Sequence, residues 1–227
     1  MEPLEIHVLK NGRCRVFQGE ARRVFYSTEE AVALALLKVN PAQEDVGSMT
    51  WMDFLTTHGI AIGRRGTTII TMMVRPAKMR TVPWRATRHG EEPLQSLVAT
   101  FPPLLILTRM VDAKLVKSFM YMIQPGKEQS LTTRGSDRCL VPFPYGNVYD
   151  YGKICWGTVA TTEIAHPCEV EDLFFKSGFN GDLWTADVLD IEDASLADLV
   201  ERTGGDLPSP PVSAYGTSVR DAMEMLT

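Results

Sequence analysis

The feature that most constrains the fold is a series of β-rich runs joined by short turns. Between Gly59 and Val74 two such runs flank the segment Gly63-Arg64-Arg65-Gly66. Two more runs lie between Leu104 and Ile123, on either side of Asp112-Ala113. Short β-rich runs bounded by glycine or aspartate are typical of neighbouring strands that pair through tight turns. The sequence therefore predicts an antiparallel meander.

The N-terminal part predicts a hairpin followed by a helix. Asn11-Gly12 lies between Ile6–Lys10 and Arg13–Phe17, and this dipeptide accepts the positive φ angles of a hairpin turn. Further on, Ser27 and Glu30 have the spacing of a capping box, which predicts a helix that ends before Pro41. Together these elements form a predicted N-terminal extension over residues 1–47.

Two later segments lack the periodicity of a strand or a helix. Met79–Pro93 is polar and basic and contains two prolines, which predicts a long surface loop. Val141–Asn147 contains two prolines and a glycine, which predicts a shaped loop instead of a central strand. A helix is expected to begin at His166-Pro167, with acidic residues in its first turn, and to end at Gly178.

The C-terminal part, residues 206–227, predicts a linker and a short helix beyond a core of residues 48–205. Leu207–Pro211 has the composition of a stiff linker. Val219, Ala222, Met223 and Leu226 fall on one helical face. That face could pack on the core or bind a partner protein, and the sequence leaves both possibilities open.

Composition limits the function. A formal net charge of -5 argues against a nonspecific nucleic-acid binder, which needs excess Lys and Arg. The apolar runs are much shorter than the ~20 residues that cross a bilayer, and the start resembles no secretion signal, so a cytoplasmic protein is expected. The four cysteines, Cys14, Cys139, Cys155 and Cys168, are expected to be thiols.

The segment from Asn147 to Thr158 is the most informative about chemistry. It contains an asparagine, a turn that ends at Gly152, and Ile154-Cys155 at the end of a short apolar step. This order resembles the active-site segment of ubiquitin-conjugating enzymes, in which a helix follows the cysteine. The stretch Asp172–Phe179 is similar to that of the bacterial subgroup called prokaryotic family D, which includes protein B of the PRTRC plasmid system. The resemblance extends over Leu104 to Asp182.

The resemblance implies an α+β fold of the ubiquitin-conjugating-enzyme type, with an antiparallel meander and flanking helices. It implies that Cys155 carries a ubiquitin-like modifier as a thioester, a role that needs an accessible thiolate. Asn147 would polarise the thioester or hold the loop in place, and Asp182 would steer the attacking amine. The family's His-Pro before the asparagine is replaced here by Tyr145-Gly146, and Tyr145 is expected to take over the packing.

The resemblance also implies partners. They are the modifier, a ThiF-like adenylating enzyme that activates it, a target protein, and a metalloprotease that removes the modifier again. Such systems, including the Bil-type antiphage systems, act in antiphage defence or plasmid maintenance. No small cofactor is expected for the carrier itself.

Three alternatives remain open from the sequence. Cys139, Cys155, His166 and Cys168 could bind zinc, although their spacing lacks a Cys-X-X-Cys pair. A cysteine hydrolase could use Cys155 with His166 or His58 as its base. A noncatalytic scaffold of the same fold could bind a ubiquitin-like protein without chemistry.

Overall fold

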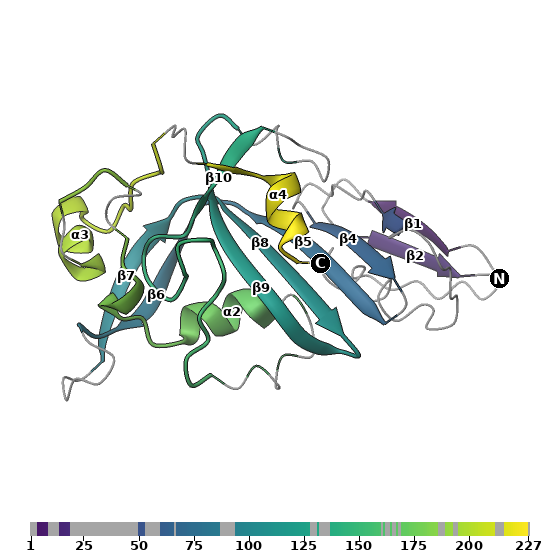
Figure 1. Ribbon diagram of the computed structural model, residues 1–227, viewed down its shortest axis with the longest axis horizontal. Coiled ribbons are helices and arrows are strands. Elements are labelled where there is room, and N and C mark those ends of the chain that lie inside the picture. Colours follow the sequence, from purple (N-terminus) through teal and green to yellow (C-terminus); the bar gives the residue numbers. More distant parts are fainter. Residues whose placement is uncertain are drawn as a thin grey trace.

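A computed structural model of the chain describes residues 4–8, 14–18, 50–52, 60–65, 67–86, 94–127, 131, 137–159, 161, 164, 167, 169–185, 189–192, 195–211 and 216–226 (Figure 1). The predicted N-terminal hairpin is present, since β1 (Leu4–Val8) pairs antiparallel with β2 (Cys14–Gln18). Val8 pairs with Cys14, which differs by one residue from the register of a two-residue turn at Asn11-Gly12. The helix predicted between Ser27 and Pro41 lies outside the described residues.

The centre of the structure is a sheet of seven strands in the order β11-β10-β9-β8-β5-β4-β3. Its strands are β3 (Thr50–Met52), β4 (Ile60–Arg65), β5 (Thr68–Arg75), β8 (Leu104–Val111), β9 (Lys114–Ile123), β10 (Arg138–Pro142) and β11 (Thr217–Ser218). All neighbouring strands run antiparallel. The predicted meander is therefore confirmed, and the fold is α+β.

Turn positions differ in detail from the prediction. Asp112 and Ala113, with φ angles of 50° and 58°, form the expected turn between β8 and β9. The preceding turn lies later than predicted, because Gly63, opposite Ile70, is still part of the β4 ladder. Similarly, β10 extends to Pro142 and lies between two strands, so the predicted loop begins only after its first two residues.

The prediction of a surface loop over Met79–Pro93 is wrong for its first part. β6 (Lys78–Trp84) pairs antiparallel with β7 (Gln95–Phe101) as a two-stranded ribbon. The ribbon lies between β5 and β8 in the sequence, although β5 and β8 pair with each other in the sheet. Pro83 fits here because its carbonyl points to the outer edge, where it accepts from the Phe179 amide at 2.7 Å. Its missing N–H falls on that same edge, so no bond to β7 is lost.

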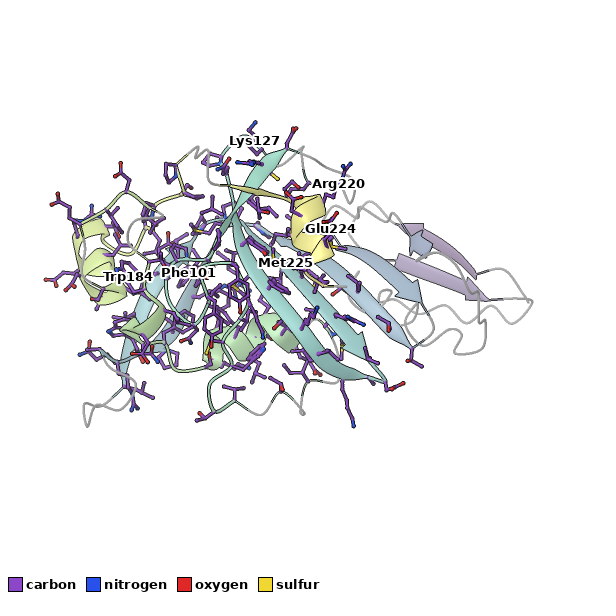
Figure 2. All side chains as sticks on the ribbon, in the orientation of Figure 1. Phe101, Lys127, Trp184, Arg220, Glu224 and Met225 are labelled. Atoms are coloured by element: carbon purple, nitrogen blue, oxygen red, sulfur yellow. The ribbon has the colours of Figure 1, made fainter. Side chains whose placement is uncertain are left out.

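Both faces of the sheet are covered, because alternate residues of each strand point to opposite sides. On one face Met73, Ile106 and Met120 join a core with β6, β7 and the helices α2 (Glu169–Lys176) and α3 (Leu196–Thr203). Phe101 belongs to this core, and Figure 2 shows it near Trp184 on the side of the molecule where β7 lies.

The opposite face is covered by α4 (Val219–Glu224), which crosses the sheet in Figure 1. Val219, Ala222 and Leu226 are fully buried there against strand residues such as Leu105 and Leu107. The apolar face of the predicted C-terminal helix thus packs on the core. Burial of Val219 and of Leu226 contributes roughly 1.5–3 kcal/mol each, which secures α4 and the residues after it to the sheet.

Besides α4, the C-terminal half contains one predicted helix, α2, and one helix that was not predicted, α3. α2 follows Pro167 and has acidic residues in its first turn, as expected. Ser195 caps the start of α3, because its hydroxyl accepts from the Asp198 amide, and Gly204 in left-handed conformation caps its end. These are ordinary helix start and stop signals that identify α3 in retrospect.

The segment Leu207–Pro211 is not the spacer that its composition predicted. The Leu207 amide donates to the Thr100 carbonyl at 3.1 Å, and the Leu207 side chain is buried. The Pro208 carbonyl accepts a hydrogen bond from the Tyr145 hydroxyl at 2.6 Å. These contacts attach the segment to β7 and to the loop after β10. None of the helices in the described ranges has the length and apolar character needed to cross a bilayer.

Candidate functional site

An open cavity of about 410 Å³ lies between the loop after β10 and the C-terminal end of α2. Cys155, Asn147 and Asp182, the three residues that the sequence predicted for the site, all line it. They come from separate parts of the chain, and the fold brings them together. The remaining walls include Arg85 and Leu94, which adjoin the ribbon.

Cys155 is half-buried and lies directly beyond an anchored residue. The side chain of Ile154 is buried in the core, and its amide donates to the Ser118 carbonyl of β9 at 2.9 Å. The Cys155 amide donates to the Asn147 carbonyl at 2.7 Å. The Trp156 indole N–H donates to the Ser118 hydroxyl at 2.9 Å. Hydrogen bonds of the Cys155 backbone and of the residues before and after it thus hold the thiol at the wall of the cavity.

The turn between Asn147 and Cys155 is rigidly placed against β9. The Tyr149 amide donates to the Lys153 carbonyl at 2.9 Å, which closes the turn. Gly152, with φ of 92°, lies against the ring of Tyr121, and a Cβ at this position would collide with that ring. Tyr121 in turn donates its hydroxyl to the Tyr151 carbonyl at 3.0 Å. Glycine is therefore required at position 152 for both its backbone conformation and its size.

Asn147 is buried and adopts a left-handed backbone conformation with φ of 56°. Its side-chain Nδ2 donates to the Gly178 carbonyl at 3.0 Å and to the Ser177 hydroxyl at 3.3 Å. The Ser177 hydroxyl donates its own hydrogen to the Phe174 carbonyl, so it can only accept from Asn147. Both partners are acceptors, which settles the orientation of the amide. Its two hydrogens are committed to the C-terminal end of α2.

Asp182 is exposed on the 3-10 turn Gly181–Leu183, which follows α2. The turn begins at Asn180, whose Oδ1 accepts from the Asp182 amide at 2.9 Å. Asparagine is favoured at this capping position because its oxygen satisfies an amide of the first turn. The cap fixes the backbone that presents the Asp182 carboxylate at the edge of the cavity.

Tyr145-Gly146 supports the loop that carries Asn147. Tyr145 is fully buried, with its ring edge-on to those of Phe101 and Phe143. Burial raises the pKa of its hydroxyl far above the ordinary value. Gly146 has φ of 106°, and a Cβ there would lie 2.8 Å from the Asn180 carbonyl oxygen. Tyr145 therefore packs in the core beneath this loop, and the glycine permits close contact with the segment that leads to Asp182.

The helix that holds Asn147 is itself tied to the strands by charge. Glu171 of α2 is buried and pairs with Arg75 of β5 at 2.6 Å and with Arg80 of β6. The Arg80 guanidinium also lies over the ring of Phe175 at 4.1 Å from its centroid. A buried carboxylate with two guanidinium partners is costly to disrupt, because any group left behind loses its compensation. The position of α2 is therefore well determined.

Several residues of the cavity were not predicted. Ser177 was predicted only as one of the last residues of the helix that ends at Gly178. Its position next to the helix end was the one sequence signal that it could lie at a site. Arg85 and Leu94 lay in or next to the segment that was interpreted as a loop. Only the pairing of β6 with β7 brings them to the cavity, and no local sequence signal indicates it.

The alternative roles for the thiols are tested only in part. Cys139 is fully buried on β10, where burial raises the pKa of its thiol. Within the described residues no three side chains of Cys, His, Asp or Glu are grouped closely enough to bind a metal ion. His58, His166 and Cys168, which the zinc and hydrolase alternatives require, lie outside those residues.

Comparison of the chain with protein-family models gave no match, and neither did comparisons with curated proteins and with solved structures. The geometry of the cavity and the sequence around Cys155 therefore carry the functional inference.

Proposed function

We propose that the chain is a ubiquitin-conjugating-type carrier, in which Cys155 accepts a ubiquitin-like modifier as a thioester and passes it to an amine. The observation that carries this proposal is the meeting of Cys155, Asn147 and Asp182 in one open cavity. The order of elements also supports it, since an antiparallel meander precedes the cysteine loop and α2 follows it. The proposed fold is correspondingly of the ubiquitin-conjugating-enzyme type.

In the proposed loading step the Cys155 thiolate attacks the thioester carbonyl of a modifier carried on its adenylating enzyme. A new carbon–sulfur bond forms, the old one breaks, and the departing thiolate takes up a proton. In the second step an amine of the target attacks the Cys155 thioester, an amide bond forms, and the Cys155 thiolate leaves while the amine loses a proton. The half-buried thiol at the cavity wall suits a group that must meet two different proteins.

Asn147 is assigned the second of its two possible roles in this proposal. Its N–H groups hold the end of α2, so they are not directed at the thioester in this arrangement. Asn147 is therefore a positioning residue that fixes the loop before Cys155. Asp182, exposed at the edge of the cavity, is the carboxylate that would attract the ammonium group of an approaching lysine and accept its proton.

The proposed partners are those that the resemblance implies: the modifier, a ThiF-like adenylating enzyme, a target protein and a metalloprotease that removes the modifier. The proposed setting is the cytoplasm, in antiphage defence or plasmid maintenance.

The test is a loading reaction with ATP and with the ubiquitin-like protein and adenylating enzyme expected in the same gene cluster. One modifier per chain should appear on a non-reducing gel and disappear with reductant. Cys155→Ser should give a reductant-resistant ester, and Cys155→Ala should give no adduct. Cys139→Ala is the matched control, because that thiol is buried, and it should load normally. Loading of Cys155→Ala at the normal rate would refute the proposal.

A further inference from the structure

The ribbon of β6 and β7 has one face in the core and one face in solvent. In the antiparallel register, Met79 lies opposite Thr100 and Thr81 lies opposite Val98, on the face away from buried Val82. We call this surface the outer ribbon face; it consists of Met79, Thr81, Pro83, Ser96, Val98 and Thr100. Met79 is 68% exposed and Val98 49%, so two large apolar side chains stand uncovered on it.

Part of each edge of the ribbon is already bonded to other segments of the chain. On the β7 edge the Thr100 amide donates to the Gly205 carbonyl at 2.7 Å. On the β6 edge the Arg85 amide donates to the Phe179 carbonyl at 3.0 Å. Strand addition uses free backbone groups at a sheet edge, and these bonds occupy the edge of β7 at Thr100 and the end of β6 beside Arg85. The side-chain face is a separate surface of the ribbon that these bonds leave open for a partner.

The outer ribbon face leads to the thiol cavity. Arg85 follows the last residue of β6 and Leu94 precedes the first residue of β7, and both line the cavity together with Cys155. Leu94 is 48% exposed, so it continues the apolar surface of Val98 up to the cavity. The side chains that make up the face include no carboxylate, although the chain as a whole has a net charge of -5.

We propose that the outer ribbon face is the seat for the folded body of the ubiquitin-like modifier while its C-terminal carboxyl is bonded to Cys155. This inference rests on the proposed function. We assign the face to the modifier because, in the proposed function, the modifier is the partner bonded to Cys155, in the cavity where the ribbon ends. From Val98 to Leu94 the strand spans ~13 Å at ~3.3 Å per residue, a gap that about four extended tail residues bridge. The surface of the modifier that contacts the outer ribbon face is apolar, to match Met79 and Val98.

The test uses the full chain with a photo-crosslinking benzoylphenylalanine in place of Val98 or of Val116. Val116 is the matched control, because it is also a strand valine, is 52% exposed, and lies on β9 outside the ribbon. Each chain is loaded with the ubiquitin-like protein of the gene cluster, separated from the adenylating enzyme, irradiated and then reduced. Modifier that remains attached after reduction should be at least tenfold more abundant for position 98.

Charged substitutions give a second measurement. Val98→Asp should lower kcat/KM for loading about tenfold, whereas Val116→Asp should change it less than twofold. If the wild-type chain forms no thioester, the proposed function fails and the ribbon inference fails with it. If thioester forms normally but positions 98 and 116 behave alike, the ribbon inference alone is overturned. Equal folding of both variants by circular dichroism ensures that the comparison concerns binding.

Discussion

The hydrogen bonds from Asn147 to the end of α2 give a prediction that separates two readings of this residue. Asn147→Asp keeps the size of the side chain and its tolerance for left-handed geometry, but it replaces the two N–H donors by an oxygen. That oxygen would face the Gly178 carbonyl and the Ser177 hydroxyl, which both act as acceptors. The substitution therefore removes two hydrogen bonds and adds repulsion in a buried place.

The expected loss can be estimated from these contacts. Two hydrogen bonds contribute about 0.5–1.5 kcal/mol each, and an unpaired buried polar group costs about 1–3 kcal/mol. We expect Asn147→Asp to lower the free energy of unfolding by about 3 kcal/mol. Asn147→Ala should lower it by about 2–3 kcal/mol, because alanine also disfavours the left-handed φ of 56°. Asn147→Gly relieves that strain and should lose about 1 kcal/mol less than alanine.

The assay is urea denaturation followed by tryptophan fluorescence, combined with the rate at which iodoacetamide alkylates Cys155. Loosening of the loop should raise that rate in the Asn147→Asp chain. Asn180→Asp is the matched control, because the oxygen of Asn180 is the atom in use and aspartate retains it, so stability should change by less than about 0.5 kcal/mol. Equal stability of Asn147→Asp and the wild type would refute the assigned orientation of the amide.

Three further predictions concern other parts of the structure. Cys155 should be alkylated much faster than Cys139 at pH 8, as measured by peptide mass mapping, because burial protects Cys139 and raises the pKa of its thiol; equal rates would contradict the placement of the two thiols. Burial raises the pKa of the Tyr145 hydroxyl in the folded chain. The stability that the neutral hydroxyl gives the folded state is therefore complete below pH ~10, and above it the free energy of unfolding falls by about 1.4 kcal/mol per pH unit. Tyr145→Phe should therefore reduce the slope of stability against pH above pH 10, and an unchanged slope in urea titrations would count against it. Glu171→Ala should lower the free energy of unfolding by about 3 kcal/mol, because it leaves two guanidinium groups without their carboxylate; a loss below about 1 kcal/mol in the same assay would show that the ion pairs are dispensable.

Local chemistry along the chain was enough to predict several elements. The turn at Asp112-Ala113 and the helix after Pro167 were predicted because their signals lie within a few residues of each other. The β-rich runs bounded by turn residues predicted the four strands β4, β5, β8 and β9, but not β3, β10 or β11. The C-terminal helix was also found from its apolar face, although its binding partner, the sheet, was not.

Other elements depend on contacts between residues that are distant in the sequence. Pro83 argued for a loop, but the edge that it occupies in β6 needs no donor at that place. Leu207–Pro211 resembled a spacer until β7 supplied bonding partners for its backbone. In both cases composition described the segment in isolation, whereas the neighbouring backbone determined its conformation.

For the candidate site, the sequence by itself determined which residues are present: a thiol after a tight turn, an asparagine before that turn, and an aspartate after a helix. Only the tertiary structure decided that all three line one cavity and that the hydrogens of Asn147 bind Gly178 and Ser177. The physical reason is that a hydrogen bond depends on the positions of both partners. Here one partner belongs to a loop and the other to the end of α2, and only the packing of the core brings them within 3.3 Å.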